Sequence, residues 1–260
     1  MRPLVEWQPD ETIGVFTDID DTLTTEGAIT PDALQALADL KAAGLHVVPV
    51  TGRPVGWSEP FAQSWPVDAI VAENGAVALV HTDGQPLRKL YQQEAGTRSA
   101  NFARMQQVLS RIEREIPGAQ RSHDSAGRET DIAIDHSEFT RLPPTAIDAV
   151  VQLMQSEGMT ATVSSIHING WYGTHDKLSG ARWIVRELFG RDLDAELNCW
   201  VYVGDSTNDQ VMFGHFRHSV GVANIQRFAN QLTHPPHYVT QAERGAGFAE
   251  LARHVLRGRA

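Results

Sequence analysis

The stretch VFTDIDDTLT (residues 15–24) has three carboxylates within four positions, directly after an apolar run. Asp18 and Asp20 are two residues apart, so in an extended segment both side chains point to the same side while Ile19 packs away. Two carboxylates that face one ligand suit nucleophilic attack combined with general acid–base chemistry. Asp21 points the other way in this geometry, and we expect it to cap the following turn.

Two further apolar runs also end in polar residues. LHVVPV (residues 45–50) is followed by Thr51, Gly52 and Arg53, and CWVYV (residues 199–203) is followed by GDSTND. Because ligands collect outside the carboxyl ends of strands in an open α/β sheet, we expect the three segments to meet in one pocket. Besides Asp21, the acidic residues after VFT are Asp18 and Asp20, and those after CWVYV are Asp205 and Asp209. Such a group would be self-repulsive without a cation, and hard oxygen ligands suit Mg2+, so the sequence predicts a magnesium site.

Other interpretations of these segments are mostly weaker. DIDDTLTTEGAI fails as a calcium loop, because its sixth residue is Leu23 rather than Gly and its twelfth is Ile29 rather than Glu. GAGF (residues 245–248) lacks the third glycine of a dinucleotide fingerprint, and the chain has no GxxxxGK[ST] loop. A solvated turn stays open for DIDDT taken alone, since acidic residues often cap turns after strands.

The composition bounds the class of protein. A chain of 260 residues predicts two lobes, or one domain with a large insertion. The formal net charge of -10 argues against the basic surface that binding to nucleic acid or an anionic membrane requires. We find no apolar run of membrane-spanning length and no export signal, so we expect a soluble cytoplasmic protein, monomeric or homodimeric. The single cysteine, Cys199, excludes an internal disulfide and is expected in the core.

The outer portions of the chain alternate apolar runs with helical stretches, which is typical of a parallel sheet covered by helices. Strands are expected at 13–17, 45–50, 69–80 with a turn at Asn74-Gly75, near 88–92, at 199–203 and at 219–224. Helices are expected at 30–44, 56–65, 178–190, from 207 onward, and at 246–257. The sequence therefore predicts an α/β fold.

The alternation of strands and helices changes in the middle of the chain. Residues 98–116 and 144–158 have the apolar spacing of amphipathic helices, and residues 129–137 and 160–170 are each expected to form one strand. This order predicts a compact α+β insertion with short hinges near 82–97 and 171–175. We assign 1–82 and 176–260 to the core and 83–175 to the inserted domain.

Taken in order, four segments resemble the motifs of the haloacid dehalogenase-like (HAD) phosphatases: DIDDT, VTGRP, the lysine of DKLSGARWIV, and VGDSTND. The resemblance covers essentially the whole chain. An insertion between the threonine and lysine motifs resembles the type IIB subgroup, which includes Cof-like sugar phosphatases, sucrose-phosphate phosphatases and phosphomannomutases. AENGA and ERGAGFAEL also look like segments of that subgroup. The resemblance implies a Rossmann-like, doubly wound parallel sheet with an inserted α+β cap.

The resemblance also implies catalytic roles. Asp18 would be the nucleophile that forms an aspartyl phosphate, and Asp20 would be the acid and then the base. An acid at the second position favours hydrolysis of a phosphate ester. Thr51 and Lys177 would bind the phosphoryl oxygens and stabilise their charge in the transition state.

The ligands of Mg2+ follow from the same resemblance. The carboxylates of Asp18 and Asp205 and the backbone carbonyl of Asp20 would hold the ion. Asp209 would lie near it directly or through water, because it is one helical turn from Asp205. An N-terminal helix charge is the alternative for Asp209, and a surface charge is the alternative for Lys177.

The cap would close over the leaving group and supply specificity. Its candidate residues are His123, Arg128, Asp131, His167, Asn169, Trp171 and His175. Taken singly, each is more typical of a surface or hydrogen-bonded structural group, but their clustering at strand ends favours polyol recognition. Core candidates for substrate binding are Thr51, Gly52, Arg53, Asn74, Lys177 and Asn224. Asn224 could orient Lys177, touch phosphate, or only stabilise a turn, and Thr22 is expected to bond locally.

The leading hypothesis is a Mg2+-dependent phosphatase that acts on a small phosphate ester, with a sugar phosphate as the favoured substrate. A phosphosugar mutase stays open, because it would use the same nucleophile and cap but keep the phosphate on the carbohydrate. A non-catalytic metabolite-binding protein that uses the acidic site only for metal also stays open.

Overall fold

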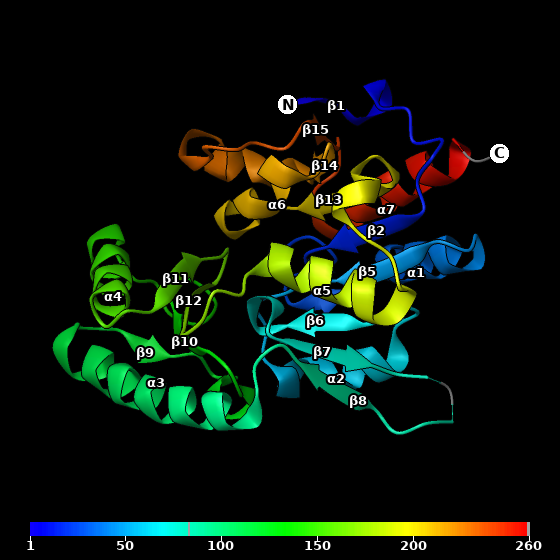
Figure 1. Ribbon diagram of the computed structural model, residues 1–260. Coiled ribbons are helices and arrows are strands. Elements are labelled where there is room, and N and C mark those ends of the chain that lie inside the picture. The colour runs from blue at the N-terminus through cyan, green and yellow to red at the C-terminus, as the bar shows by residue number, and fades with distance from the viewer. Residues whose placement is uncertain (83, 259–260) are drawn as a thin grey trace.

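The computed structural model describes residues 1–82 and 84–258, and its largest element is a six-stranded parallel sheet (Figure 1). The strand order is β1-β15-β14-β13-β2-β5. The strands are β1 (Arg2–Pro3), β2 (Gly14–Thr17), β5 (His46–Pro49), β13 (Trp200–Gly204), β14 (His218–Gly221) and β15 (Tyr238–Val239). Parallel strands bring their carboxyl ends to one edge, and this edge is where the polar motifs begin.

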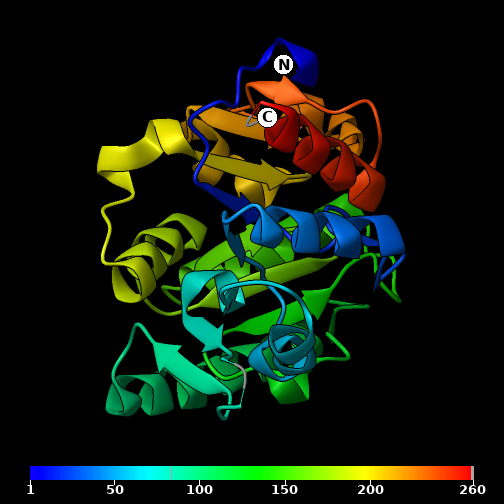
Figure 2. The same ribbon diagram turned by 90° about the vertical axis from the view of Figure 1, so that its right-hand side faces the viewer.

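Helices cover both faces of this sheet because its strands are apolar on both sides. In β2, Val15 packs into one hydrophobic cluster and Phe16 into the other. The Val15 side is covered by α1 (Pro31–Ala42), α2 (Val55–Ser64) and α7 (Arg244–Arg257), and the Phe16 side by α5 (Lys177–Phe189) and α6 (Gln210–His215). Helices α1 and α7 lie side by side although they are far apart in the sequence (Figure 2).

A three-stranded antiparallel sheet continues the core. It consists of β6 (Ile70–Ala72), β7 (Val77–Val80) and β8 (Arg88–Tyr91), and an isolated parallel bridge joins Val50 to Val71 of β6. The 3-10 turn η2 (Glu73–Gly75) interrupts the predicted strand 69–80 at the predicted place. A hairpin of β3 (Thr24–Thr25) and β4 (Ala28–Ile29) follows β2.

The cap is a separate antiparallel sheet of order β11-β12-β10-β9, covered by two helices (Figure 1). Its strands are β9 (Gln120–Arg121), β10 (Ile132–Asp135), β11 (Thr160–Val163) and β12 (His167–Trp171), and its helices are α3 (Ala95–Glu115) and α4 (Pro144–Ser156). Ile134 and Ile168 pack under the helices. Because side chains alternate across a strand, His167 and Asn169 of β12 point to the opposite face.

One expectation needs correction. Residues 160–170 form two antiparallel strands rather than one, because a turn at Ser164 reverses the chain. The Ser164 hydroxyl accepts from the amides of Ile166 and His167 and so stabilises that turn. Strand β8 falls inside the segment assigned to the cap, yet it pairs with β7 of the core. The division of the chain at 82/83 and 175/176 stays a prediction.

The expected fold class is confirmed: a central parallel sheet with helices on both faces carries an inserted α+β unit. Within residues 1–82 and 84–258, no helix has the length and apolar character that a membrane crossing needs.

Candidate active site

The ends of two neighbouring strands bring three buried carboxylates together. Strands β2 and β13 are paired in parallel, and the Asp18 amide donates to the carbonyl of Val203 at 2.9 Å. Asp18 therefore lies beside the segment that follows β13. One carboxylate oxygen from each of Asp18, Asp205 and Asp209 lies within 4.8 Å of the others, and all three residues are buried.

Lys177 is the cation inside this group. It is the first residue of α5, whose start is fixed by reciprocal hydrogen bonds between Asp176 and Ser179. Its Nζ lies 3.0 Å from Asp18 Oδ1 and 2.7 Å from Asp209 Oδ1. Burial lowers the pKa of Lys177, but the two carboxylates outweigh that effect and raise it above its ordinary value.

One ammonium does not balance three carboxylates. Burial raises the pKa of Asp18 to about 7, with Lys177 acting against it and Asp209 adding to it. Burial, together with Asp209 and Asp18, also raises the pKa of Asp205 well above its usual range. Hard oxygen donors with an excess of negative charge are what Mg2+ prefers, so these residues fit a divalent cation.

Two side chains orient Asp205. The Thr22 hydroxyl donates to Asp205 Oδ1 at 3.4 Å, and the Asn224 amide donates to Oδ2 at 3.2 Å. The Thr22 hydroxyl thus bonds to the residue that follows β13, rather than locally as expected. Asn224 also donates to the carbonyl of Asp21 and accepts from the amide of Arg244, and it makes no hydrogen bond to Lys177 within the described part of the chain.

Asp209 is held by its own loop. Its Oδ2 accepts from the amides of Asp205 and Ser206 at 2.9 and 3.1 Å, and its Oδ1 accepts from the Tyr202 hydroxyl and from Lys177. Asp209 therefore has buried partners in addition to its place at the start of a helix.

Asp20 lies outside the carboxylate group and is bound by Arg53. Arg53 Nε lies 3.0 and 2.9 Å from the two carboxylate oxygens of Asp20, and Nη2 lies 2.9 Å from Oδ1. The loop that holds Arg53 is fixed by Thr51, whose buried hydroxyl oxygen accepts from the Arg53 amide at 3.0 Å. Thr51 is thus connected to the predicted acid, Asp20, through Arg53.

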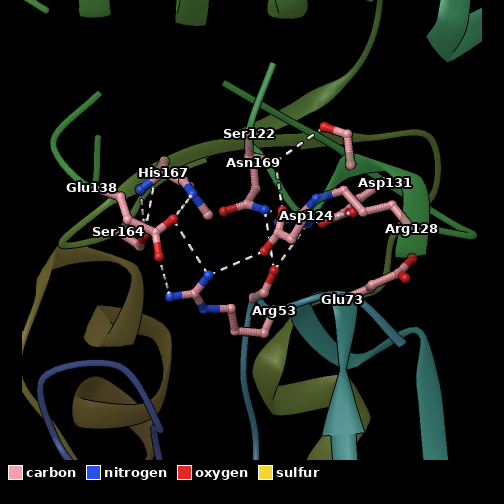
Figure 3. Close-up of polar contacts among 12 residues, drawn as sticks. Arg53, Glu73, Ser122, Asp124, Arg128, Asp131, Glu138, Ser164, His167 and Asn169 are labelled. Atoms are coloured by element: carbon pink, nitrogen blue, oxygen red, sulfur yellow. Dashed lines mark hydrogen bonds and ion pairs between the residues drawn. The ribbon is translucent and has the colours of Figure 1, made fainter. Parts of the chain in front are cut away.

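Arg53 also joins the core to the cap (Figure 3). Its Nη2 donates to Glu138 Oε1 at 2.7 Å, and its Nη1 donates to Asp124 Oδ2 at 3.2 Å. His167 Nε2 lies 2.8 Å from Glu138 Oε2. Burial raises the pKa of Glu138, but the contacts with His167 and Arg53 lower it to about 2. Glu138 is therefore ionised at neutral pH.

A second polar group fills the junction beneath the cap sheet (Figure 3). Arg128 Nη1 donates to Asp131 Oδ1 at 2.7 Å and to the carbonyl of Gly52 at 3.1 Å. The Asn169 amide donates to Asp131 at 3.1 Å and to the same carbonyl at 3.3 Å, while Asn74 lies 3.5 Å from Asp131. A Cβ on Gly52 would lie 3.2 Å from Asn74 Oδ1 and 3.3 Å from Asn169 Oδ1, so a side chain at this position would crowd both amides. Five candidates for substrate binding thus meet here.

Glu73 anchors the cap to the core and was missed by the sequence analysis. It is fully buried, and its carboxylate accepts from the amide of Val55 in α2 at 3.0 Å. From the cap it accepts the amide of Glu129 at 2.9 Å and the amide and hydroxyl of Thr130, each at 2.5 Å. The sequence feature that could have indicated Glu73 is its position as a carboxylate inside the apolar run AIVAENGAVALV.

Other missed residues offered no signal in the sequence. Asp124 and Glu138 lie in cap loops and meet Arg53 only through the packing of the cap on the core. Arg244 Nε lies 3.1 Å from Asp21 Oδ1, so Asp21 is paired in addition to lying in a turn with a positive φ of 55°.

Three cap candidates lie apart from these two groups. His123 is exposed and stacks on Phe139, with ring centroids 4.3 Å apart. Trp171 is buried and donates its indole N–H to the carbonyl of His175 at 2.9 Å. His175 is 5% exposed, and neither ring nitrogen has a hydrogen-bond partner among the described residues. Burial lowers the pKa of His175 to about 4, with Asp176 acting against it.

A family comparison identifies the first part of the chain. Residues 15–111 match the family described as haloacid dehalogenase-like hydrolase. No curated protein sequence matches the chain.

Solved structures share the fold over nearly the whole chain. A Thermoplasma acidophilum protein, 0175, is 17% identical with a TM-score of 0.71, covering 94% of this chain and 98% of its own. The sucrose-phosphatase of Synechocystis sp. PCC6803, solved with sucrose and phosphate, is 15% identical with a TM-score of 0.67 and the same coverage. A HAD/COF-like hydrolase of Plasmodium vivax, described as putative, is 18% identical with a TM-score of 0.69, covering 95% and 96%.

Proposed function

We propose that this chain, whose residues 15–111 match the haloacid dehalogenase-like hydrolase family, is a Mg2+-dependent phosphatase that releases phosphate from a small phosphate ester, a sugar phosphate. The observation that carries the proposal is the buried group of Asp18, Asp205 and Asp209 around Lys177. Their oxygens lie within 4.8 Å, and Lys177 Nζ is 3.0 Å from the predicted nucleophile.

Asp18 acts as the nucleophile. A carboxylate oxygen of Asp18 attacks phosphorus, an O–P bond forms, and the bond from phosphorus to the sugar oxygen breaks. Lys177 and Thr51 bind the phosphoryl oxygens and stabilise their charge in the transition state. Asp18, Asp205, Asp209 and the backbone carbonyl of Asp20 would hold Mg2+, which when bound supplies further positive charge to the phosphoryl group.

Asp20 moves the protons. It donates a proton to the leaving sugar oxygen in the first step, and in the second it takes a proton from the water that attacks phosphorus. That attack breaks the bond from Asp18 to phosphorus and restores the free carboxylate. Arg53 orients Asp20 through its contacts with both carboxylate oxygens.

The sugar would lie between the core and the cap. The group formed by Gly52, Asn74, Arg128, Asp131 and Asn169 supplies donors and acceptors at that junction. The sucrose-phosphatase of similar fold, solved with sucrose and phosphate, supports a sugar as the leaving group.

The test is release of free phosphate from p-nitrophenyl phosphate and from a panel of sugar phosphates, with Mg2+ and with excess EDTA. We expect turnover with Mg2+ only, and Asp18→Asn should lower it by at least roughly 10³-fold. Asp39→Asn, an exposed carboxylate on α1, is the matched control and should retain full activity.

Three results would overturn the proposal. Undiminished turnover in the Asp18→Asn variant would exclude Asp18 as the nucleophile. Turnover in EDTA equal to that with Mg2+ would exclude a requirement for the metal. Rearranged sugar phosphate without free phosphate would identify a mutase instead.

A further inference from the structure

A cavity of about 500 Å³ opens beside Asp20, between the β3–β4 hairpin of the core and the loops of the cap. The residues of its lining that matter here are Asp20, Asp21, Glu26, Arg53, Glu138 and Phe139. An alcohol that takes its proton from Asp20 must contact that side chain. The inference therefore rests on the proposed function and concerns which alcohol can occupy this cavity.

The lining is strongly acidic. Four of its side chains are carboxylates and one is a guanidinium, which gives a net charge of -3 when all are ionised. Of the permanently charged groups outside it, Arg244 lies 3.1 Å from Asp21 and Asp124 lies 3.2 Å from Arg53, and these two offset each other. His167 lies 2.8 Å from Glu138 and, when protonated, cancels one of the three excess negative charges. Neighbouring ion pairs thus leave the cavity negative.

Glu26 is the least compensated of these carboxylates. It is exposed in the turn of the β3–β4 hairpin and forms no ion pair with any residue in 1–82 or 84–258. Glu138, on the cap side, lies 2.7 Å from Arg53, which it shares with Asp20 and Asp124. Acidic groups therefore face the cavity from both the core and the cap.

Phe139 adds an aromatic surface. Its side chain is 64% exposed at the cavity, and its ring stacks on His123 at a centroid distance of 4.3 Å. An aromatic face attracts cations and packs against apolar surface. Carboxylates beside such a ring suit hydroxyl and ammonium groups, and they disfavour a ligand carboxylate or a second phosphate.

We propose that the leaving group is a sugar without negative charge of its own, either unmodified or amino-substituted, and that Glu26 and Glu138 exclude acidic sugars from the cavity. Like charges brought together at a partly buried site cost free energy, whereas an ammonium group gains it. The substrate class is thus narrowed from sugar phosphates in general to those whose only anionic group is the phosphate that is transferred.

Three esters with the same pyranose ring test the proposal: glucosamine 1-phosphate, glucose 1-phosphate and glucuronate 1-phosphate. For each, kcat/KM for phosphate release and the inhibition constant against p-nitrophenyl phosphate are measured with Mg2+ at low ionic strength. We expect glucuronate 1-phosphate to be disfavoured at least roughly tenfold against glucose 1-phosphate in both quantities. Glucosamine 1-phosphate should equal or exceed glucose 1-phosphate, and added salt should narrow the differences.

Substitution of Glu26 links the effect to the cavity. Glu26→Gln should lower the discrimination against glucuronate 1-phosphate by about two- to threefold, and Glu26→Lys should lower it further. Glu187→Gln removes an exposed carboxylate of α5 outside the lining and should leave the ratio unchanged.

The outcomes separate this inference from the proposed function. The protein could hydrolyse p-nitrophenyl phosphate and yet bind and turn over glucuronate 1-phosphate as well as glucose 1-phosphate. That result would overturn the charge proposal and leave the proposed function standing. Equal effects of Glu26→Gln and Glu187→Gln on the ratio would also overturn it. Failure to hydrolyse any ester with Mg2+ would overturn the proposed function, and calorimetric affinities of the three esters would then decide the charge ranking.

Discussion

The guanidinium of Arg53 contacts both carboxylate oxygens of Asp20, with Nε 3.0 Å from Oδ1 and 2.9 Å from Oδ2. The same guanidinium donates to Glu138 and Asp124 of the cap. The predicted acid is therefore oriented by a residue that also holds the cap. In the proposed mechanism, proton transfer by Asp20 would depend on the position of the cap.

Arg53→Lys is expected to lower phosphatase activity most on substrates with poor leaving groups. A lysine ammonium cannot bind several carboxylates in the planar geometry of a guanidinium, so Asp20 loses its orientation. We expect kcat/KM to fall by about 10- to 100-fold for a sugar phosphate. It should fall much less for p-nitrophenyl phosphate, whose leaving group needs no proton. Equal losses on both substrates would contradict this role of Arg53.

Lys177→Met is expected to destabilise the metal-free protein. The substitution leaves Asp18 and Asp209 buried without their cation, and breaking a buried ion pair in this way costs about 3–5 kcal/mol of the free energy of unfolding. Urea denaturation in EDTA measures it. Lys89→Met is the control, since Lys89 is 34% exposed and its pairs with Glu59 and Glu129 should contribute less than about 1 kcal/mol. Equal losses in the two variants would contradict the prediction.

Mg2+ is expected to stabilise the folded protein. A ligand that binds only the native state at 100 times its Kd adds about 2.7 kcal/mol to the free energy of unfolding. Thermal unfolding should therefore shift upward with Mg2+ at pH 8 and return with EDTA. Asp205→Asn should abolish most of the shift, while Asp39→Asn should keep it. A shift of full size in Asp205→Asn would exclude Asp205 as a ligand.

Glu73→Gln is expected to loosen the cap at its anchor. Glutamine replaces one acceptor oxygen with a donor that faces the N–H and O–H groups of Val55, Glu129 and Thr130, at a cost of about 1–3 kcal/mol. Hydrogen exchange should accelerate at the amides of Glu129 and Thr130. Glu187→Gln, which removes an exposed carboxylate of α5, serves as the control and should leave exchange at both amides unchanged. Unchanged exchange at both amides would argue against an anchoring role.

His175 is expected to make the protein sensitive to acid. Its pKa is about 4 in the fold and 6.5 when unperturbed, because burial disfavours the charged ring. The unfolded state therefore binds a proton first, and the stability that the neutral ring contributes is complete above pH 6.5 and is lost as the pH falls toward 4.

His175→Phe keeps a ring against Trp171 but cannot be protonated. The free energy of unfolding of the variant, relative to the natural protein, should rise between pH 7.5 and pH 5. Urea denaturation at the two pH values measures it, and a difference that does not change with pH would contradict the prediction.

The sequence by itself determined the local features. The two-residue spacing of Asp18 and Asp20 and the polar groups after three apolar runs predicted where a site would form. The alternation of strands and helices predicted the parallel sheet, and the change of rhythm predicted the insertion. These features depend on backbone period and strand direction, which act over a few residues and are therefore visible in a linear pattern.

The tertiary structure alone decided which side chains meet. Spacing could not reveal that Arg53 lies between Asp20, Asp124 and Glu138, or that Thr22 and Asn224 orient Asp205. It also could not reveal that Glu73 joins α2 to the cap. Each contact connects segments that are distant in the chain. The contacts of Asp124, Glu138 and Glu73 depend on how the cap packs on the core, and those of Thr22 and Asn224 depend on how the core strands lie side by side. The charge of the cavity beside Asp20, on which our proposal for the leaving group rests, comes from core and cap side chains that the packing of the cap on the core brings together.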